Sequence, residues 1–236
     1  MKVAIMQPYF FPYLGYFQLI SSVDRFVLFD DVQYIRHGWL NRNRILKPEE
    51  GWQYIIAPLQ KHKQVELIKD TKLQDGDEWK KKIIRQLDHY KKKAKHFDEV
   101  MQLLTYCFSS NETSIAKFNA HCLAIFCKHL QIPFKVEISS EMDFDYSNVK
   151  DSGEWALRIS EQLKAKEYIN PVSGRELFDR NKFINANIKL TFLSSPLDAY
   201  NQRRKNFETG LAIIDVLMFN GVEQTRKMIN GFEINN

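Results

Sequence analysis

The sequence is poor in the features that classify a chain at once. It contains three cysteines, Cys107, Cys122 and Cys127, with no CxxC pair and no zinc-type spacing. An odd number of scattered cysteines argues against a disulfide framework, and we expect small buried thiols in a reducing compartment instead. GxGxxG, GxxxxGK[ST] and GxSxG motifs are also missing. The sequence therefore predicts no metal site and leaves any cofactor unknown.

Long apolar stretches are missing as well. No run approaches the roughly 20 apolar residues of a transmembrane helix. The N-terminus, MKVAIMQP, has too short an apolar region for a signal peptide. We therefore expect a cytoplasmic protein with no transmembrane segment.

The composition is that of a globular chain with a modest positive charge. The 236 residues are 44% hydrophobic and carry a net charge of +5. Basic residues are concentrated in Lys80–Lys95, KKKIIRQLDHYKKKAK. This segment is either the solvated face of a helix, which we favour, or a patch for phosphates of nucleic acid, nucleotide or membrane. No nucleic acid is expected as a partner, because aromatic stacking platforms are not interleaved with these charges.

The first 43 residues predict a βαβ unit. Lys2–Met6 is a short apolar strand, and Gln7-Pro8 ends it because proline cannot donate to a sheet ladder. A helix from about Leu14 to Ser22 and a second strand, Arg25–Phe29, follow. Units of this kind place parallel strands side by side.

Strand and helix patterns alternate again in the second half of the chain. Phe134–Ile138, Glu167–Asn170 and Lys189–Leu193 are predicted strands, and Ser152–Ala165 is a predicted amphipathic helix. Between the halves lies a helical stretch of about 77–131. We therefore predict one α/β domain, 1–236, with a mainly parallel, Rossmann-like sheet and a helical insertion.

Polar and aromatic side chains crowd the segments where the first two strands end. They are Gln7, Tyr9, Asp30, Asp31, Gln33, Tyr34, His37, Trp39, Asn41, Arg42 and Asn43. Because ligands of open α/β sheets bind outside the carboxyl ends of the strands, we expect a site there. The alternative is that the aromatic residues only cover the sheet edge and that an aspartate caps a turn.

The catalytic candidates in this segment are two carboxylates and one imidazole. Asp30 or Asp31 could act as a general base or bind a divalent cation, and only one of the two is expected to face the cleft. His37 is the one histidine in the segment to test as a base, although a surface histidine is the favoured interpretation. Farther along, main-chain N–H groups at Ser173-Gly174-Arg175 could hold an anion, with Arg175 adding charge; an ordinary loop is an equal alternative.

Five segments together resemble the WbqC-like protein family. They are QPYFFPYLGYFQLI, DDVQYIRHGWLNRNRI, SGRELFD, AYNQ and LAIIDVLMFNG. The resemblance adds Gly174, Tyr200, Gln202, Asp215 and Asn220 to the residues of interest. It also implies a role in clusters for O-antigen and other surface polysaccharides. In similar pathways, an acyl or aminoacyl group such as glycyl is added to the amine of a nucleotide-linked deoxy-aminosugar.

A second resemblance concerns Tyr13-Leu14-Gly15-Tyr16, between the first strand and the first helix. HxGH-type nucleotidylyltransferases have their signature there, with two histidines that stabilise charge on phosphates. Tyr13 and Tyr16 can hydrogen-bond a phosphate but carry no positive charge at neutral pH. The resemblance implies a nucleotidylyltransferase-like fold and nucleotide binding, and it disfavours nucleotidyl transfer.

The leading hypothesis is therefore a transferase that acts on a nucleotide-linked sugar. Arg42 and Arg175 would hold the phosphates, and Tyr9, Tyr34 and Trp39 would stack on the base or the sugar. An ATP-dependent ligase or nucleotidylyltransferase-like enzyme is one alternative, and a non-catalytic scaffold of a polysaccharide pathway is another. A homo-oligomer is compatible with each of them.

Overall fold

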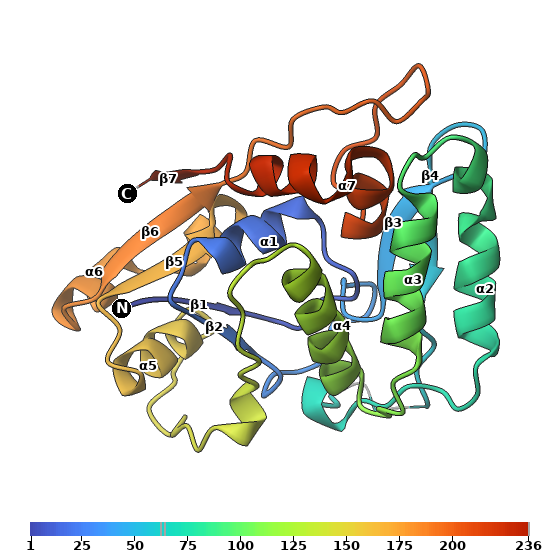
Figure 1. The fold of residues 1–236 in the computed structure, drawn as a ribbon. Coiled ribbons are helices and arrows are strands. Elements are labelled where there is room, and N and C mark those ends of the chain that lie inside the picture. The colour runs from blue at the N-terminus through green and yellow to red at the C-terminus, as the bar shows by residue number, and fades with distance from the viewer. Residues whose placement is uncertain (62, 64, 236) are drawn as a thin grey trace.

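The computed structural model describes residues 1–61, 63 and 65–235, and it has a mixed α/β architecture (Figure 1). The central sheet contains β1 (Lys2–Met6), β2 (Arg25–Leu28), β5 (Glu167–Pro171), β6 (Lys189–Ser194) and β7 (Glu233–Asn235). Their order is β2-β1-β5-β6-β7, with β7 antiparallel to β6 and the other pairs parallel. The predicted mainly parallel sheet is confirmed.

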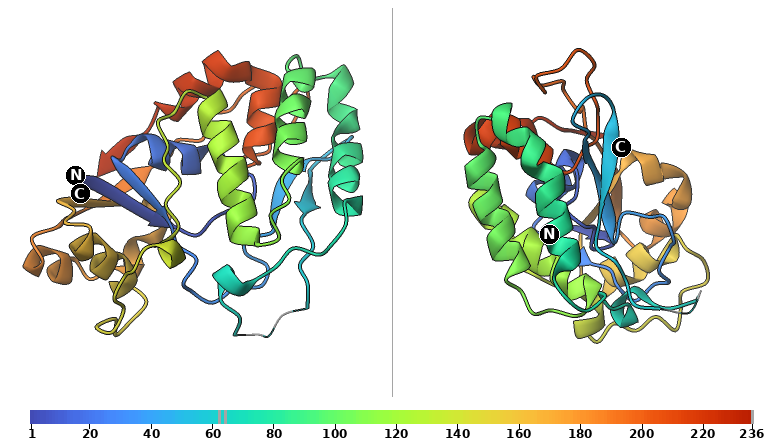
Figure 2. Two further views of the ribbon diagram at one scale, coloured as in Figure 1. Left: turned by 60° about the horizontal axis from the view of Figure 1, so that its bottom comes forward. Right: turned by 90° about the vertical axis from the view of Figure 1, so that its right-hand side faces the viewer.

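Alternating side chains along the strands build two apolar layers. In β1, Ala4 packs into one cluster of buried residues, whereas Val3 and Ile5 pack into the other. Helices α1 (Leu14–Ser21) and α7 (Ile213–Ile229) cover the first face, and α5 (Glu154–Gln162) and α6 (Arg180–Asn185) cover the second (Figure 2). Both faces are covered over β1, β2, β5 and β6, which explains why the inner positions of these strands are mostly apolar.

The helical stretch predicted in the middle of the chain contains α2 (Glu78–Leu87), α3 (Phe97–Phe108) and α4 (Ile115–His129). These helices share one core with the first sheet face, and Phe10 and Phe11 of the N-terminal loop pack among their aromatic rings. An antiparallel hairpin, β3 (Arg42–Leu46) and β4 (Trp52–Ile56), lies beside α2. That this stretch is an insertion into a single domain stays a prediction.

Short 3₁₀ helices connect the larger elements. They are η1 (Ile68–Asp70), η2 (Asp88–Lys92), η3 (Ser139–Glu141) and η4 (Val172–Leu177). Among the described residues, none of the helices has the length and apolar character needed to cross a bilayer.

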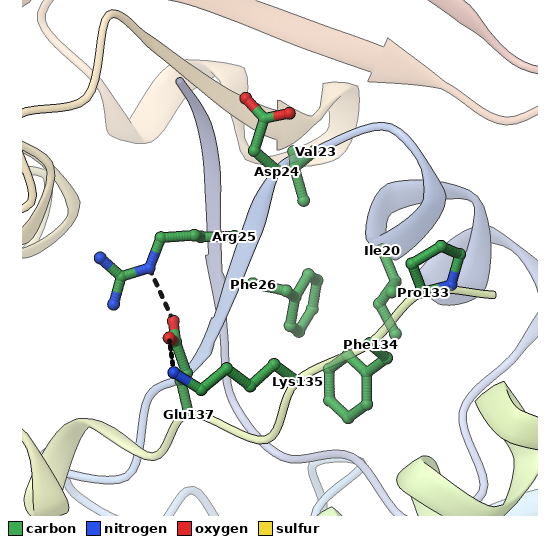
Figure 3. A pocket seen from close by; sticks show the side chains of 9 residues that line it. All are labelled: Ile20, Val23, Asp24, Arg25, Phe26, Pro133, Phe134, Lys135 and Glu137. Atoms are coloured by element: carbon green, nitrogen blue, oxygen red, sulfur yellow. Dashed lines mark hydrogen bonds and ion pairs between the residues drawn. The ribbon is translucent and has the colours of Figure 1, made fainter.

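The predicted strand Phe134–Ile138 is wrong. The segment meets β2 through one main-chain hydrogen bond, from Leu28 N–H to the Glu137 carbonyl at 2.8 Å, and one isolated bridge at Ile138. Nearer Pro133 it diverges from β2 and leaves a hollow of about 400 Å³ (Figure 3). Apolar alternation alone could not predict this, because a ladder also needs a neighbour that runs alongside.

The order of the strands defines a switch point between β1 and β5. From β1 the chain crosses through α1, on one face, to β2. It later returns through α5, on the opposite face, to β5 on the other side of β1. In open α/β sheets, crossovers that diverge in this way leave a crevice at the carboxyl ends of the two strands.

Candidate functional site

A cleft of about 700 Å³ lies at the carboxyl ends of β1, β2 and β5. Most of its wall is apolar or aromatic, formed by Ile5, Met6, Phe29, Val32, Ile35, Trp155, Ala156, Tyr168, Pro171, Leu177 and Phe178. The polar part is formed by Gln7, Tyr9, Gln33, Ser152, Asn170, Ser173 and the Gly174 backbone. None of these described lining residues carries a formal charge at neutral pH. The cleft is therefore suited to a ligand portion that is polar, partly apolar and uncharged.

Two carboxamides occupy equivalent positions on the two switch-point strands. β1 is followed by Gln7-Pro8, and β5 ends in Asn170-Pro171. The proline ends the ladder in each case, so the preceding amide stands at the end of the strand. The side chain of Gln7 has no hydrogen-bond partner among the described residues, so its donors and acceptor are available to a ligand.

Asn170 is held in place by its own strand and by a glycine. The Tyr168 hydroxyl donates to Asn170 Oδ1 at 2.9 Å, and Asn170 Nδ2 donates to the Pro171 carbonyl at 3.0 Å. A Cβ on Gly174 would lie 2.4 Å from Asn170 Nδ2. Gly174 is therefore required for the close approach of η4 to this carboxamide.

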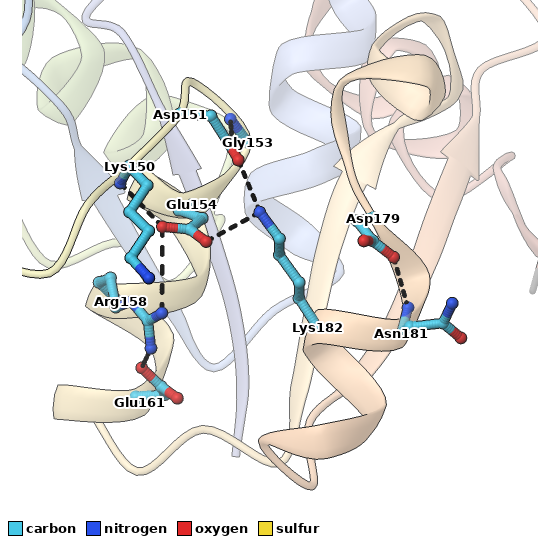
Figure 4. Close-up of polar contacts among 9 residues, drawn as sticks. All are labelled: Lys150, Asp151, Gly153, Glu154, Arg158, Glu161, Asp179, Asn181 and Lys182. Carbon is cyan, nitrogen blue, oxygen red and sulfur yellow. Dashed lines mark hydrogen bonds and ion pairs between the residues drawn. The ribbon is translucent and has the colours of Figure 1, made fainter.

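An ion-pair network supports the outer wall of the cleft (Figure 4). Lys182 Nζ of α6 lies 2.6 Å from Asp151 Oδ2 and 2.8 Å from Glu154 Oε1 at the start of α5. A Cβ on Gly153 would lie 2.2 Å from the Leu177 carbonyl oxygen. These contacts tie α5, α6 and η4 together, and these elements contribute Trp155, Leu177 and Phe178 to the wall.

Only one of the three tyrosines predicted near β1 lines the cleft. Tyr9 does so, and burial raises the pKa of its hydroxyl, which therefore stays protonated at neutral pH and can donate to a ligand. Tyr16 is buried and donates to the Gln7 carbonyl at 2.8 Å, a bond that fixes the end of β1. Tyr13 packs over Gly15, where a Cβ would lie 2.5 Å from its ring.

Asp30 anchors η3 and does not line the cleft. Its carboxylate accepts from the Ser139 hydroxyl at 2.9 Å, and from the Ser140 N–H at 3.0 Å and hydroxyl at 2.7 Å. Burial raises the pKa of Asp30, and the serine hydrogen bonds oppose that shift. A carboxylate surrounded by donors is a poor fit to a cation site.

Asp31 lies one aromatic layer behind the cleft. It accepts from the Tyr146 hydroxyl at 2.9 Å and pairs with Lys69 at 3.0 Å. The Tyr146 ring packs 4.9 Å from that of Trp155, which lines the cleft. The two carboxylates therefore have separate partners, and neither reaches the cleft directly.

The segment after β2 is divided between the cleft and the interior. Gln33 lines the cleft. Tyr34 is buried and donates to Asn41 Oδ1 at 3.1 Å. Asn43 Nδ2 donates to the main-chain oxygens of Phe10 at 3.0 Å and Phe11 at 2.8 Å, so it fastens the aromatic loop.

The remaining residues of this segment lie on the side of the hairpin. The Arg42 guanidinium lies 4.3 Å from the centre of the Tyr54 ring and donates to the His37 carbonyl. His37 is exposed and has a positive φ of 66°. Trp39 lies near the guanidinium of Arg44, which is 5.5 Å from its ring. None of these side chains is among the residues that line the cleft.

The predicted C-terminal residues are placed differently from Gly174. Asp215 is fully buried and accepts from the Tyr90 and Tyr200 hydroxyls at 2.5 Å each. Burial raises the pKa of Asp215 to about 6. The Gln202 side chain pairs with the main chain of Glu208, and the Arg175 guanidinium lies 4.8 Å from the centre of the Phe192 ring. The Asp215 and Gln202 contacts are internal to the fold, whereas Arg175 is exposed and directly follows Gly174, which lines the cleft.

A comparison with models of protein families identifies the family of this chain. The model of the WbqC-like protein family matches residues 7–227. The chain belongs to the WbqC-like protein family. An uncharacterized protein of Mycobacterium tuberculosis, Rv1507c, is 33% identical to it over 227 residues, which cover 94% of this chain and 95% of the relative. No solved structure matches.

The cleft of this WbqC-like protein includes residues that the sequence did not single out. Asn170, Tyr168, Trp155 and Phe178 are the main ones. The repeated carboxamide–proline pair at the ends of β1 and β5 is a signal that could have identified Asn170. Trp155 and Phe178 have no such signal, because they come from a helix and a connection outside the strand ends.

Proposed function

We propose that this chain is an enzyme of bacterial cell-surface polysaccharide biosynthesis, acting in the cytoplasm, with a Rossmann-like nucleotide-binding fold. It binds a nucleotide-linked deoxy-aminosugar and transfers an acyl or aminoacyl group, such as glycyl, to the sugar amine. The observation that carries this proposal is the cleft at the switch point, whose polar groups are carboxamides and hydroxyls and whose walls are aromatic.

Such a cleft suits a sugar or a nucleobase. Gln7 offers its donors and its acceptor, and Asn170 keeps one N–H and one oxygen lone pair beyond its internal bonds, which match sugar hydroxyls and base edges. The Trp155 and Phe29 rings cover apolar faces. An unpaired phosphate inside would be costly, so the diphosphate lies at the mouth. Arg36 and Arg175 directly follow the lining residues Ile35 and Gly174 and are its proposed partners.

The same lack of charge favours the reaction. An amine taken out of water into an uncharged cleft has a lowered pKa, because burial disfavours its protonated form. It is then present as the neutral nucleophile that acyl transfer needs. The Tyr146 and Trp155 rings lie between Asp31 and the cleft, so in this proposal Asp31 takes up the amine proton through a bridging water and not by direct contact.

Calorimetric titration with uridine- and thymidine-diphosphate-linked aminosugars tests the proposal. Gln7→Glu keeps the shape of the side chain but adds a negative charge to the cleft, and we expect affinity to fall at least about tenfold. Gln74→Glu makes the same change at an exposed position and should leave affinity unchanged. Equal affinity of the wild type and Gln7→Glu for every nucleotide sugar would overturn this site.

The ATP-using alternative predicts release of pyrophosphate that depends on ATP and magnesium. The βαβ unit of β1, α1 and β2 favours nucleotide binding in general. Against phosphate chemistry at Tyr13-Leu14-Gly15-Tyr16 stands the burial of Tyr16, whose hydroxyl already donates to the Gln7 carbonyl. Measuring pyrophosphate in the same samples separates the two functions.

A further inference from the structure

Three segments that are distant in sequence meet at the outer end of the hairpin. They are the β3–β4 turn (47–51), η2 with the following residues (88–95), and the 203–205 part of the loop before α7. Lys93 Nζ donates to the Pro48 carbonyl at 3.1 Å, and Arg204 Nη1 donates to the Gly51 carbonyl at 3.0 Å. Figure 1 and the right view of Figure 2 show the loop before α7 projecting beyond the helices, on the side where the β3–β4 turn lies. We call these segments the basic corner.

The basic corner carries as much net positive charge as the whole chain. Its cationic residues are Lys47, Lys91, Lys92, Lys93, Lys95, Arg203, Arg204 and Lys205. Against these eight cations stand three acids, Glu49, Glu50 and Asp88, which leaves +5, equal to the net charge of the complete sequence. The rest of the molecule is electrically balanced.

These cations are not neutralised by ion pairs within the described part of the chain. By contrast, Lys80 and Lys81 of α2 pair with Asp77 at 2.7 Å and Glu78 at 2.8 Å. The two halves of the basic segment therefore differ: two of the four cations of α2 are ion-paired, whereas no described cation of 91–95 is. Apart from Arg204, which clamps the loop to the turn, the eight cations are exposed.

We propose that the basic corner docks the protein on an anionic lipid bilayer. Six of its cations are lysines, whose flexible point charges suit a diffuse negative surface, whereas Arg-rich forks suit single phosphates. Phe207 follows Lys205 by two residues in the same loop, is 36% exposed and adds an aromatic side chain to this surface. Single-stranded nucleic acid would need stacking platforms among the cations, and Phe207 instead packs edge-on against Tyr200.

The test is co-sedimentation with vesicles. Wild-type protein should bind vesicles of phosphatidylcholine and phosphatidylglycerol but not vesicles of phosphatidylcholine alone, and binding should weaken as salt rises. A corner variant, Lys91→Gln, Lys92→Gln, Lys95→Gln and Lys205→Gln, should lose at least about tenfold in apparent affinity. A control variant, Lys72→Gln, Lys128→Gln, Lys166→Gln and Lys189→Gln, removes the same charge from exposed positions elsewhere and should bind like the wild type.

Three results would overturn the proposal. They are no binding of the wild type to the anionic vesicles, an equal loss in both variants, and binding of a single-stranded oligonucleotide in place of vesicles. Thermal unfolding of both variants checks that they are folded. Nucleotide-sugar binding, measured on the same samples, is independent of this result, so failure of one proposal leaves the other standing.

Discussion

The cleft and the aromatic loop beside it use the same side-chain group for opposite purposes. Asn43 and Asn119 are buried, and each gives its amide to two main-chain oxygens around the loop. Gln7, at the edge of the same loop, keeps its carboxamide free of partners among the described residues. The difference shows that residue type does not decide the role of a carboxamide in this segment. A carboxamide whose hydrogen bonds are already made within the protein is structural, and one without internal partners is available to a ligand.

The largest expected effect comes from removing one of the buried side-chain amides. Asn43→Ala leaves the Phe10 and Phe11 carbonyls and the Arg44 N–H without their partner. At about 1 kcal/mol or more for each buried group left unsatisfied, the free energy of unfolding should fall by about 3 kcal/mol. Urea unfolding measures it. A change below about 1 kcal/mol would contradict the structural role given to Asn43.

The next effect is a pH dependence of stability, which is expected from the buried Asp215 and not from the cleft. The folded pKa of Asp215, about 6, lies above its ordinary value of 3.8. Stability from this group is therefore fully present below about pH 4 and is lost as the pH rises through 6. From below about pH 4 to above about pH 7 the wild type should lose about 3 kcal/mol relative to Asp215→Asn, as followed by urea unfolding at each pH.

The cleft should show no such dependence. Its lining contains no carboxylate, imidazole or ammonium group among the described residues. Affinity for a nucleotide sugar without a free amine should therefore stay constant from about pH 5 to pH 8, since ionisable side chains of other kinds do not titrate there. A steep change over this interval would show that a charged group completes the site.

A smaller effect is expected at Gly174, where a substitution in the cleft wall should lower ligand affinity. Gly174→Ala places a methyl group 2.4 Å from Asn170 Nδ2 and must displace that carboxamide. We expect ligand affinity to fall about tenfold and the free energy of unfolding to fall by about 1 kcal/mol. Gly231→Ala is the contrasting variant, because its added Cβ would meet no atom closer than 3.4 Å and its φ lies outside the left-handed region. Calorimetry and urea unfolding on both variants separate a local from a general effect.

The smallest effect is expected at Gln7 itself. Gln7→Ala removes a half-buried side chain without a partner, so the free energy of unfolding should change by about 0.5 kcal/mol or less. Ligand affinity should fall in the same variant. Stability loss comparable to that of Asn43→Ala would mean that Gln7 is another structural amide.

The sequence predicted a binding site at the strand ends, and the structure shows which of the predicted residues meet there; that the cleft is this site stays a prediction. Gln7, Tyr9, Gln33 and Gly174 do line the cleft at the strand ends. Asp30, in contrast, accepts hydrogen bonds from Ser139 and Ser140, which lie 109 and 110 residues away in the sequence. No local sequence pattern predicts such distant partners. The acid–base role of the two aspartates stays a prediction, to be tested by Asp31→Asn.

The sequence by itself determined the βαβ unit of β1, α1 and β2, the strands β5 and β6, and the edge of the sheet at which polar groups gather. Apolar period and proline positions act over a few residues, so they can be read along the chain. The tertiary structure decided which polar groups face the cleft, which form hydrogen bonds in the interior, and where the net charge collects. Hydrogen bonds and charge clusters join residues that are far apart in sequence, and only folding brings them within reach of one another.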